Sequence, residues 1–360
     1  MKVLHLNSGL AFGGGLEKVI MDLMIHNKET SNYLCVINDQ ISTELINGFK
    51  QEEIMLCNRR VGSKNFLIPI IILIRILIFI KKNQIDILHC HNPFSLKFAF
   101  VIRKLCKIKV VFTVHDTNVF SKKLARYKVD RYIAISKSVY KQISEFVPTE
   151  KIDLIYNGVD INKFVMNKRE DGNDGEKFRL ACVARIMPSK KGQDLLIEAL
   201  NIIQNQYSYT NFECVFAGST EDKEAMRFLN SLVQKYNLID NVKFVGNVKE
   251  IKNIYSNTDL FILPSRYEGF GLVVVEALAA GCNVIVSRND GPLEIIKENE
   301  EYGLSFENEN YFELANKIKI FMEKDNLHFN KLKTLKYITE NYSLEKMVSG
   351  YTEVYLKSLG

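Results

Sequence analysis

Several features that mark whole protein classes are missing or sparse in this sequence. Tryptophan is absent, and the seven cysteines are scattered, odd in number and without a Cys-x-x-Cys pair. This pattern favours reduced thiols in a cytosolic protein over a disulfide framework or a zinc site. Met1-Lys2 leads directly into an apolar, strand-like run, so we expect no signal peptide. The sequence contains neither a P-loop nor a Gly-x-Gly-x-x-Gly fingerprint, which disfavours a dinucleotide-binding enzyme.

No apolar run reaches the length of a membrane span. The most hydrophobic segment, residues 66–80, contains Pro69 and Arg75 and is followed by Lys81-Lys82. It is only 15 residues long, whereas a span needs roughly 20 apolar residues. We therefore expect a helix of the first domain that is mostly buried. The alternative is that part of this helix lies on a bilayer with its basic side chains towards the headgroups.

Positive charge is concentrated in the first half of the chain. The net charge is +6, but residues 1–170 hold 26 Lys and Arg against 15 Asp and Glu, a net +11, and the remainder carries −5. A basic half favours an anionic partner such as a membrane surface, a nucleic acid or a phosphorylated substrate. Because no nucleic-acid-binding signature accompanies the charge, we expect no nucleic acid partner and place peripheral membrane contact first. An ordinary solvated basic surface is the alternative.

Short apolar runs alternate with helical patterns along the 360 residues, 47% of which are hydrophobic. Strand-like runs occupy 3–7, 85–91, 109–116, 131–136, 180–184, 212–217, 242–245, 260–263 and 284–286. A polar, glycine-bearing linker, 166–177, separates the two blocks. The alternation predicts an α/β protein of two Rossmann-like domains with parallel sheets.

The most informative stretch, 264–281, follows one of these runs. A glycine-bearing turn leads into a helix, 272–280, that Gly281 stops. Glu276 is the only polar side chain of this helix, and a helix without a polar face is buried. Because a buried carboxylate needs hydrogen-bond donors, either a ligand with paired hydroxyls, such as a ribose, or a distant Lys or Arg must supply them.

The turn before this helix has the features of a ligand site. Gly269 and Gly271 allow the backbone to approach a ligand closely. The amides of Gly271 and Leu272 open a helix N-terminus, which favours an anion such as a diphosphate. Glu268 lies at the carboxyl end of a strand, where open α/β sheets bind ligands. An ordinary loop over a buried helix is the alternative.

Two further segments lie at the carboxyl ends of predicted strands. Arg185 follows the first strand of the second half, and Lys190 and Lys191 precede Gly192, so their cations suit a diphosphate. A loop with four glycines, 8–15, precedes a helix start, which is an arrangement for anion contact.

The histidines of the first half suggest further candidates. His115 closes a strand beside Asp116, which makes it a candidate functional residue. His89 and His91 lie two apart on a strand and point to the same side, but the sequence offers no third metal ligand, so they are either structural or functional.

Together these motifs resemble the retaining glycosyltransferases of family 4, which have the GT-B fold. The resemblance covers nearly the whole chain and departs from the family at Asn283, where proline is usual. Its matching segments are the EX7E motif from Glu268 to Glu276, Gly14-Gly15-Leu16-Glu17, Thr113-Val114-His115-Asp116, Asn157-Gly158-Val159-Asp160 and Arg185 to Gly192. The resemblance implies two Rossmann-like domains facing each other across a cleft. The acceptor-side domain spans 1–165 together with a C-terminal helix, 344–360, that crosses back to it, and the nucleotide-sugar domain spans 177–343.

The resemblance also implies the roles of individual residues. The catalytic set is His115, Glu268, Arg185 and Lys191, with Lys190 as the competitor of Lys191. The donor-binding set is Gly14, Gly15, Arg185, Lys191, Glu268, Gly269, Phe270, Gly271, Leu272 and Glu276. No Asp-x-Asp occurs, so we expect no metal and no cofactor. The donor is expected to be a nucleotide sugar with UDP as the nucleotide and a hexose as the sugar, transferred with retention.

The acceptor is less constrained. We expect a glycan or lipid-linked acceptor in bacterial surface polysaccharide synthesis, such as capsule, lipopolysaccharide O-antigen or teichoic acid, and a cytoplasmic protein that contacts the inner face of the membrane. A small soluble acceptor, a nucleotide-sugar isomerase and a nucleotide-sugar sensor on the same fold are the alternatives.

Overall fold

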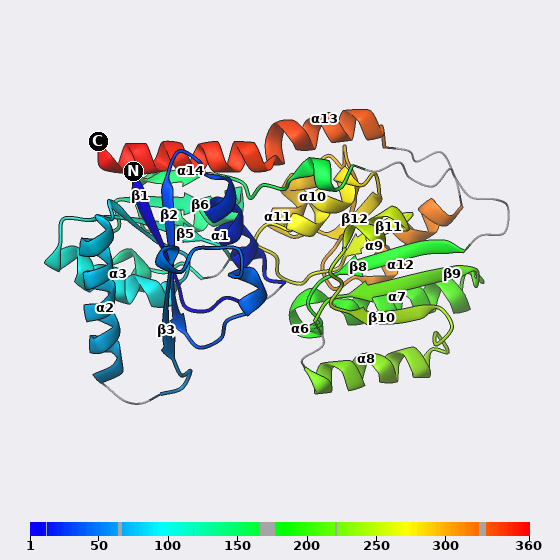
Figure 1. The fold of residues 1–360 in the computed structure, drawn as a ribbon. Helices are drawn as coiled ribbons and strands as arrows, with labels where there is room; N and C mark the ends of the chain where they lie inside the picture. The colour runs from blue at the N-terminus through cyan, green and yellow to red at the C-terminus, as the bar shows by residue number, and fades with distance from the viewer. Residues whose placement is uncertain (12, 64–66, 118, 166–176, 220–221, 324–328) are drawn as a thin grey trace. The chain divides into compact units, whose positions relative to one another are not determined.

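The computed structural model describes residues 1–360 except 12, 64–66, 118, 166–176, 220–221 and 324–328. The chain divides into two compact units, one formed by Met1–Gly158 with Leu344–Gly360 and the other by Val159–Ser343 (Figure 1). Each unit contains one parallel sheet whose strands are joined by helices. The prediction of two Rossmann-like α/β domains is therefore confirmed.

The first unit is built on a seven-stranded sheet of order β3-β2-β1-β4-β5-β6-β7. Its strands are β1 (Lys2–Asn7), β2 (Ser31–Asn38), β3 (Ile54–Arg59), β4 (Ile87–Cys90), β5 (Lys109–Val114), β6 (Arg131–Ala134) and β7 (Ile152–Leu154). Its helices are α1 (Gly15–His26), η1 (Thr43–Leu45), η2 (Gln51–Glu53), α2 (Leu67–Asn83), α3 (Pro93–Leu105), α4 (Lys122–Ala125), α5 (Lys137–Ser144), η3 (Thr149–Lys151) and α14 (Leu344–Leu359). The strand order reverses between β1 and β4, which is where sheets of this kind open a ligand-binding crevice at their carboxyl ends.

The second unit repeats the arrangement with six strands in the order β10-β9-β8-β11-β12-β13. Its strands are β8 (Phe178–Val183), β9 (Phe212–Ala217), β10 (Val242–Gly246), β11 (Leu260–Leu263), β12 (Asn283–Ser287) and β13 (Leu304–Phe306). Its helices are η4 (Ile161–Lys163), α6 (Pro188–Lys191), α7 (Gln193–Asn205), α8 (Lys223–Lys235), α9 (Lys252–Ser256), α10 (Leu272–Ala279), α11 (Asp290–Ile296), α12 (Tyr311–Met322) and α13 (Lys331–Tyr342). All four residues of β11 are buried, as expected for a strand covered on both faces. Here the order reverses between β8 and β11.

The boundary between the units differs from the predicted one. Residues 159–165, which we expected in the first domain, belong to the second unit. Val159 forms a β-bridge with Ser343, and the ring of Phe164 packs 5.9 Å from that of Tyr255. These contacts bind the segment to the second unit before the predicted linker begins. The linker itself, 166–177, lies almost wholly outside the described residues.

The C-terminal helix α14 belongs to the first unit, as predicted. It contacts α1 and β5. One face, including Met347, Tyr351, Val354 and Tyr355, is buried. The Tyr355 hydroxyl lies 2.8 Å from His89 Nδ1 in β4. The helix is therefore part of the core of the first unit and contributes polar partners to its sheet.

The prediction that residues 66–80 form a mostly buried helix is wrong about its burial. In α2 one apolar face is buried, and it consists of Ile72, Ile76 and Ile80. The other face is 49–61% exposed and consists of Leu67, Ile70, Ile71, Ile74 and Ile78. The helix lies against β3, the edge strand, where Arg75 Nη2 donates to the carbonyl oxygen of Leu56 at 3.0 Å. One apolar face of α2 therefore packs inside the first unit, whereas the side chains of the other face are about half exposed. Among the described residues, no helix is both long and apolar enough to cross a membrane.

Candidate active site

Two neighbouring strands deliver most of the predicted donor-site residues to one edge of the second sheet. β8 and β11 pair in parallel at the point where the strand order reverses. Arg185 and Lys191 follow β8, and Glu268 follows β11. Because the carboxyl ends of parallel strands lie at the same edge, the three residues lie at the edge where doubly wound sheets usually bind ligands.

Gly192 holds the two loops of this edge together. It adopts a left-handed conformation with φ of +66°. A Cβ at this position would lie 1.9 Å from the carbonyl oxygen of Pro264, at the end of β11. No other residue type tolerates such an approach, so the glycine allows the loop that carries Lys191 to rest directly on the end of β11.

The Lys191 ammonium and the Glu268 carboxylate form an ion pair. Lys191 Nζ lies 2.6 Å from Glu268 Oε2, and the two side chains are 19% and 17% exposed. Such a partly buried, charge-assisted contact is better ordered than a pair on the open surface. Lys190 instead contributes its carbonyl oxygen, which accepts hydrogen bonds from the amides of Arg266 and Tyr267. Of the two candidate lysines, the structure therefore places Lys191 beside Glu268.

Arg185 presents its side chain at the same edge. The residue is exposed, and its carbonyl oxygen accepts a hydrogen bond from Gln193 Nε2 at 2.9 Å. Within the described part of the chain, the guanidinium has no ion pair. A guanidinium can bind two oxygens of a diphosphate at once, so Arg185 has the position and the chemistry expected of an anion ligand.

Arg266 fixes the turn that bears Glu268, and the sequence analysis missed it. Its guanidinium bonds the Asp194 carboxylate at 2.7 and 2.8 Å, the Glu309 carboxylate at 2.5 and 2.9 Å and the carbonyl oxygen of Pro188 at 2.6 Å. These bonds use all five N–H donors of the side chain. The hydrogen bonds that Arg266 donates to Asp194, above all, raise the pKa of the guanidinium above its ordinary value. Arg266 is therefore a structural clamp, although its position in the sequence resembles that of a ligand-binding cation.

The glycine-bearing turn ends at the N-terminus of α10. Gly271 caps the helix with φ of +93°, a left-handed conformation that glycine adopts without strain. Phe270 is 2% exposed, and its ring packs 5.6 Å from that of Tyr342. Leu272 is also buried. Contacts from Phe270 and Leu272 to a ligand would therefore come from the backbone, and the same is true of Gly269.

Glu276 is buried in the middle of α10, as the apolar helix predicted. Its carboxylate accepts a hydrogen bond from the hydroxyl of Tyr255, with Oε2 2.9 Å from the oxygen. Burial, and then the charge of Glu276, raise the pKa of Tyr255 well above its ordinary value, so the hydroxyl stays protonated and donates. This donor is a tyrosine. It comes from α9, 21 positions earlier in the chain, and no spacing in the sequence indicated it.

Gly14, Gly15 and His115 belong to the first unit. Gly14 is the N-cap of α1 and Gly15 its first residue. A Cβ at Gly14 would lie 1.8 Å from Glu17 Oε2, so the glycine lets the Glu17 side chain fold back over the start of the helix. His115 follows β5, and like the glycine loop after β1 it lies at the carboxyl edge of the first sheet.

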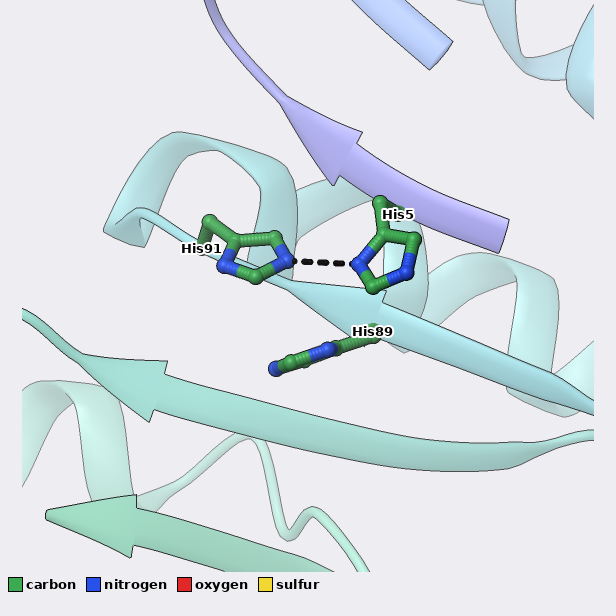
Figure 2. A group of neighbouring side chains, drawn as sticks. All are labelled: His5, His89 and His91. Atoms are coloured by element: carbon green, nitrogen blue, oxygen red, sulfur yellow. Dashed lines mark hydrogen bonds between the residues drawn. The ribbon is translucent and has the colours of Figure 1, made fainter. Parts of the chain in front are cut away.

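His115 is part of a group of four histidines, three of which the sequence analysis left undecided or overlooked. His5 on β1 pairs in register with His89 on β4, and Figure 2 shows these two rings together with His91. His5 Nδ1 lies 3.0 Å from His91 Nε2, and His91 Nδ1 lies 3.1 Å from His115 Nε2. Burial lowers the pKa of His5 to about 4 and that of His115 to about 3. Burial and the neighbouring imidazoles hold the pKa values of His89 and His91 well below the usual range.

Three of these histidines are close enough together to be considered as metal ligands. Ring nitrogens of His5, His89 and His91 lie within 4.8 Å of one another. However, both ring nitrogens of His89 already face hydroxyls, those of Tyr355 and Thr113, at 2.8 Å each. The separation between His5 and His91 is that of a hydrogen bond. A metal ion requires lone pairs that converge on one point, so hydrogen bonding describes this group better than metal coordination.

Comparison with known proteins gives the family. A family model described as "Glycosyl transferases group 1" matches residues 166–349, just over half of the chain. The chain belongs to this glycosyltransferase family. A second model, "Glycosyltransferase Family 4", matches residues 13–163 of the glycosyltransferase. The resemblance inferred from the sequence is thereby confirmed at the level of a GT-B glycosyltransferase.

Individual relatives are similar to this glycosyltransferase over different lengths. The O-antigen biosynthesis glycosyltransferase WclY of Escherichia coli is 29% identical over 63% of this chain and 61% of its own. The capsular polysaccharide biosynthesis glycosyltransferase CapH of Staphylococcus aureus is 24% identical over 92% of this chain and 93% of its own. The crystal structure of Anabaena HepE, in complex with UDP and glucose, matches 99% of this chain and 100% of its own with a TM-score of 0.81 and 19% identity. The similarity to HepE is a similarity of fold.

Proposed function

We propose that this glycosyltransferase transfers a hexose from a nucleotide sugar, with UDP as the nucleotide, to a glycan or lipid-linked acceptor, with retention and without a metal ion. The observation that carries the proposal is the carboxyl edge of the second sheet. There, Arg185 and the ion pair of Lys191 with Glu268 lie at the reversal of strand order. Two cations and a carboxylate at that edge match a ligand that joins a diphosphate to a polyhydroxylated sugar.

The chemistry follows from the charges that the reaction creates. When the bond between the anomeric carbon and the diphosphate breaks, the leaving group gains negative charge and the sugar becomes oxocarbenium-like. A fixed cation in a partly buried position stabilises that leaving group without reorganisation, which is the role of Lys191, and the exposed Arg185 adds a second cation. Glu268 then holds hydroxyls of the sugar. The acceptor oxygen bonds to the anomeric carbon, and its proton passes to an oxygen of the released diphosphate.

The nucleoside end of the donor is assigned to Glu276. A carboxylate accepts up to about four hydrogen bonds, so the bond from Tyr255 does not by itself exclude ribose hydroxyls. The bond from Tyr255 also holds the Glu276 side chain in one orientation. An ordered carboxylate binds a pair of hydroxyls with a smaller loss of conformational freedom than a mobile one would.

The acceptor class rests on the relatives. WclY is named for O-antigen biosynthesis and CapH for capsular polysaccharide biosynthesis, so synthesis of a bacterial surface polysaccharide is the function we assign. A small soluble acceptor, an isomerase of nucleotide sugars and a sensor are distinguished from it by the first experiment below.

That experiment is a donor panel. The purified protein is incubated with UDP- and GDP-sugars in EDTA, and both nucleotide release and thermal stabilisation are measured. We expect stabilisation by one UDP-hexose and slow release of UDP from it. Arg185→Ala is expected to abolish the release, whereas Arg227→Ala, at an exposed position on α8, retains it as the matched control.

Each other outcome of the panel contradicts a defined part of the proposal. Release that requires an added divalent cation contradicts metal independence. Conversion of the sugar without free nucleotide identifies an isomerase, and stabilisation without any turnover, with lipid-linked or glycan acceptors present, identifies a sensor. The absence of both stabilisation and release for every donor contradicts the assignment of the donor site.

We further propose that the exposed face of α2 rests on an anionic membrane surface. Five large apolar side chains line this face (Leu67, Ile70, Ile71, Ile74 and Ile78). Lys81 and Lys82 follow at its end. The first unit as a whole holds 25 Lys and Arg against 15 Asp and Glu, a net +10. Apolar insertion combined with attraction to anionic lipid is the binding mode of interfacial helices, and it would bring the enzyme to a lipid-linked acceptor.

Vesicle sedimentation tests this contact. We expect binding to vesicles of phosphatidylglycerol and phosphatidylcholine, weaker binding to phosphatidylcholine alone, and at least about a tenfold loss of affinity in the triple variant Ile71→Gln, Ile74→Gln, Ile78→Gln. All three side chains are at least half exposed, so the fold should tolerate the changes. Leu332→Gln, at an 82% exposed leucine of the second unit, is the control that retains binding. Equal binding of the triple variant and the wild type would contradict the proposal.

A further inference from the structure

A line of hydrogen bonds crosses the first sheet from Asn32 to His115. It runs from Asn32 Oδ1 to His5 Nε2 at 3.4 Å, from His5 Nδ1 to His91 Nε2 at 3.0 Å and from His91 Nδ1 to His115 Nε2 at 3.1 Å. Asn32 lies on β2 and His5 on β1, whereas His91 and His115 directly follow β4 and β5. His5 and His91 each use one ring nitrogen towards the preceding residue of the line and the other towards the next. The proposed function makes no use of Asn32, His5 or His91.

The amide of Asn32 has only one orientation that its neighbours allow. Its Nδ2 lies 3.2 and 3.0 Å from the carbonyl oxygens of Leu23 and Asn27, which can only accept. Its Oδ1 lies 2.7 Å from the hydroxyl of Thr30, which donates to it. The atom that faces His5 is therefore an oxygen, and an amide oxygen cannot donate a hydrogen bond.

This end point decides the position of every proton along the line. Because Asn32 Oδ1 only accepts, His5 Nε2 must carry a hydrogen, and a neutral His5 then has a bare Nδ1. His91 must donate to that nitrogen through its own Nε2–H, which leaves His91 Nδ1 bare. His115 in turn donates through Nε2–H to His91. The neutral state of all three rings follows from the lowering of their pKa values by desolvation.

At the His115 end of the line, one lone pair is left, that of His115 Nδ1. His115 Nδ1 is shielded from solvent and has no hydrogen-bond partner within the described residues. We propose that Asn32, His5 and His91 are positioning residues that hold His115 as the Nε2–H tautomer, so that His115 Nδ1 accepts a hydrogen bond from a substrate hydroxyl. The assignment of that hydroxyl to a substrate rests on the proposed function, whereas the tautomer does not.

The line orders protons but cannot carry one away. A proton taken up by His115 could be passed to His91 and then to His5, but there it would meet the amide oxygen of Asn32, which is not a base at neutral pH. His115 is therefore a hydrogen-bond acceptor for the hydroxyl and not the final base of the reaction. This fits transfer of the acceptor's proton to the diphosphate.

Histidine-selective 15N NMR of the full chain at pH 7, without substrate, measures the tautomers directly. We expect His5, His91 and His115 each to show a protonated Nε2 and a bare Nδ1. Observation of the Nδ1–H tautomer, or of an imidazolium, at either His91 or His115 would overturn the proposal. Because no donor or acceptor is present, failure of the sugar-transfer assignment leaves this result unaffected, and the two can be told apart.

Three variants separate positioning from a general structural role. His91→Phe removes the acceptor for the Nε2–H group of His115. The ratio of the Nε2–H to the Nδ1–H tautomer of His115 should therefore fall between about twofold and tenfold, the equivalent of one hydrogen bond. His91→Asn places an amide oxygen near the former Nδ1 and should restore the ratio. His89→Gln, at an equally buried position two residues earlier but outside the line, should leave it unchanged. An identical ratio in His91→Phe and the wild type, or the same change in His89→Gln, overturns the proposal.

Zinc provides the final arm of the test. The protein is dialysed against EDTA, and one equivalent of zinc chloride is added during the same measurement. We expect the N–H signals of His5 and His91 to persist. Stoichiometric zinc uptake with loss of both signals would show that the group binds a metal, and would overturn the hydrogen-bonded arrangement.

Discussion

Replacement of Lys191 by methionine is expected to lower kcat/KM for transfer about 10²- to 10³-fold, the usual effect of removing one preorganised group from the leaving-group site. The methionine keeps most of the aliphatic side chain and removes the ammonium that lies 2.6 Å from Glu268 Oε2. The loss should appear mainly in kcat, because the charge on the diphosphate grows as its bond to the sugar breaks. Nucleotide release from the donor found in the panel is the measurement.

The neighbouring lysine provides the matched control. Lys190 differs from Lys191 by one position, and its carbonyl oxygen accepts hydrogen bonds from the amides of Arg266 and Tyr267, which a side-chain substitution leaves in place. Lys190→Met is therefore expected to change kcat/KM by less than about threefold, the range of a surface charge. If Lys190→Met were the more damaging of the two, the diphosphate contact would belong to Lys190 and the geometry of the ion pair would be irrelevant to catalysis.

Glu268 needs its own control, because removal of Lys191 leaves a partly buried carboxylate without its cation. A general loss of stability would also reduce activity. The thermal midpoint of Lys191→Met should therefore be compared with that of Glu268→Gln. A large fall in activity with an unchanged midpoint supports a role in transfer, whereas parallel falls in both point to the ion pair as a structural element.

The elements that the sequence predicted well are those whose evidence is local. A buried parallel strand such as β11 is apolar throughout, and a helix such as α10 without a polar face must be buried, so both follow from short windows. The alternation of such elements predicted two Rossmann-like domains. The carboxyl ends of the strands then indicated where Arg185, Lys191 and Glu268 would lie, since all parallel strands present the same edge.

The features that escaped prediction depend on neighbours distant in the sequence. Tyr255 donates to Glu276 only because the fold brings these two residues, one on α9 and one on α10, into contact. His5 joins His91 because β1 and β4 are adjacent, although more than eighty residues separate them. The helix α2 has apolar side chains on two faces, and nothing in that pattern states which face meets the sheet. Pairing across the fold, rather than composition, decides each of these cases.

Acidification is expected to destabilise the first unit more than the second. In an unfolded chain histidine has a pKa of about 6.5. In the folded unit the pKa of His5 falls to about 4, and those of His89 and His91 lie well below the usual range, all through burial. Between about pH 6.5 and 4 the unfolded state therefore binds more protons than the native state. Stability is then fully present above pH 6.5 and is lost as the pH falls.

The expected loss of folding stability is about 1.36 kcal/mol for each pH unit and each histidine. At pH 5 this amounts to about 2 kcal/mol for each fully buried ring, 1.5 pH units below the unfolded value. The polar groups that touch these rings are hydroxyls, an amide and other imidazoles (Tyr355, Thr113, Asn32 and His115). None of these groups carries a negative charge, so among the described residues no hydrogen-bond partner of these rings offsets the cost of a buried imidazolium.

Native-state hydrogen exchange at pH 7 and pH 5, corrected for intrinsic rates, measures the effect unit by unit. Amides of β1 and β4 should lose several kcal/mol of protection, whereas amides of β8 and β11 should lose much less, because no described residue of the second unit is a histidine. His89→Gln should reduce the dependence of the first unit's stability on pH by the contribution of one histidine. Equal losses in the two units would mean that the histidines of the first sheet are already charged or hydrated at neutral pH, and the neutral hydrogen-bonded line from Asn32 to His115 could then not exist.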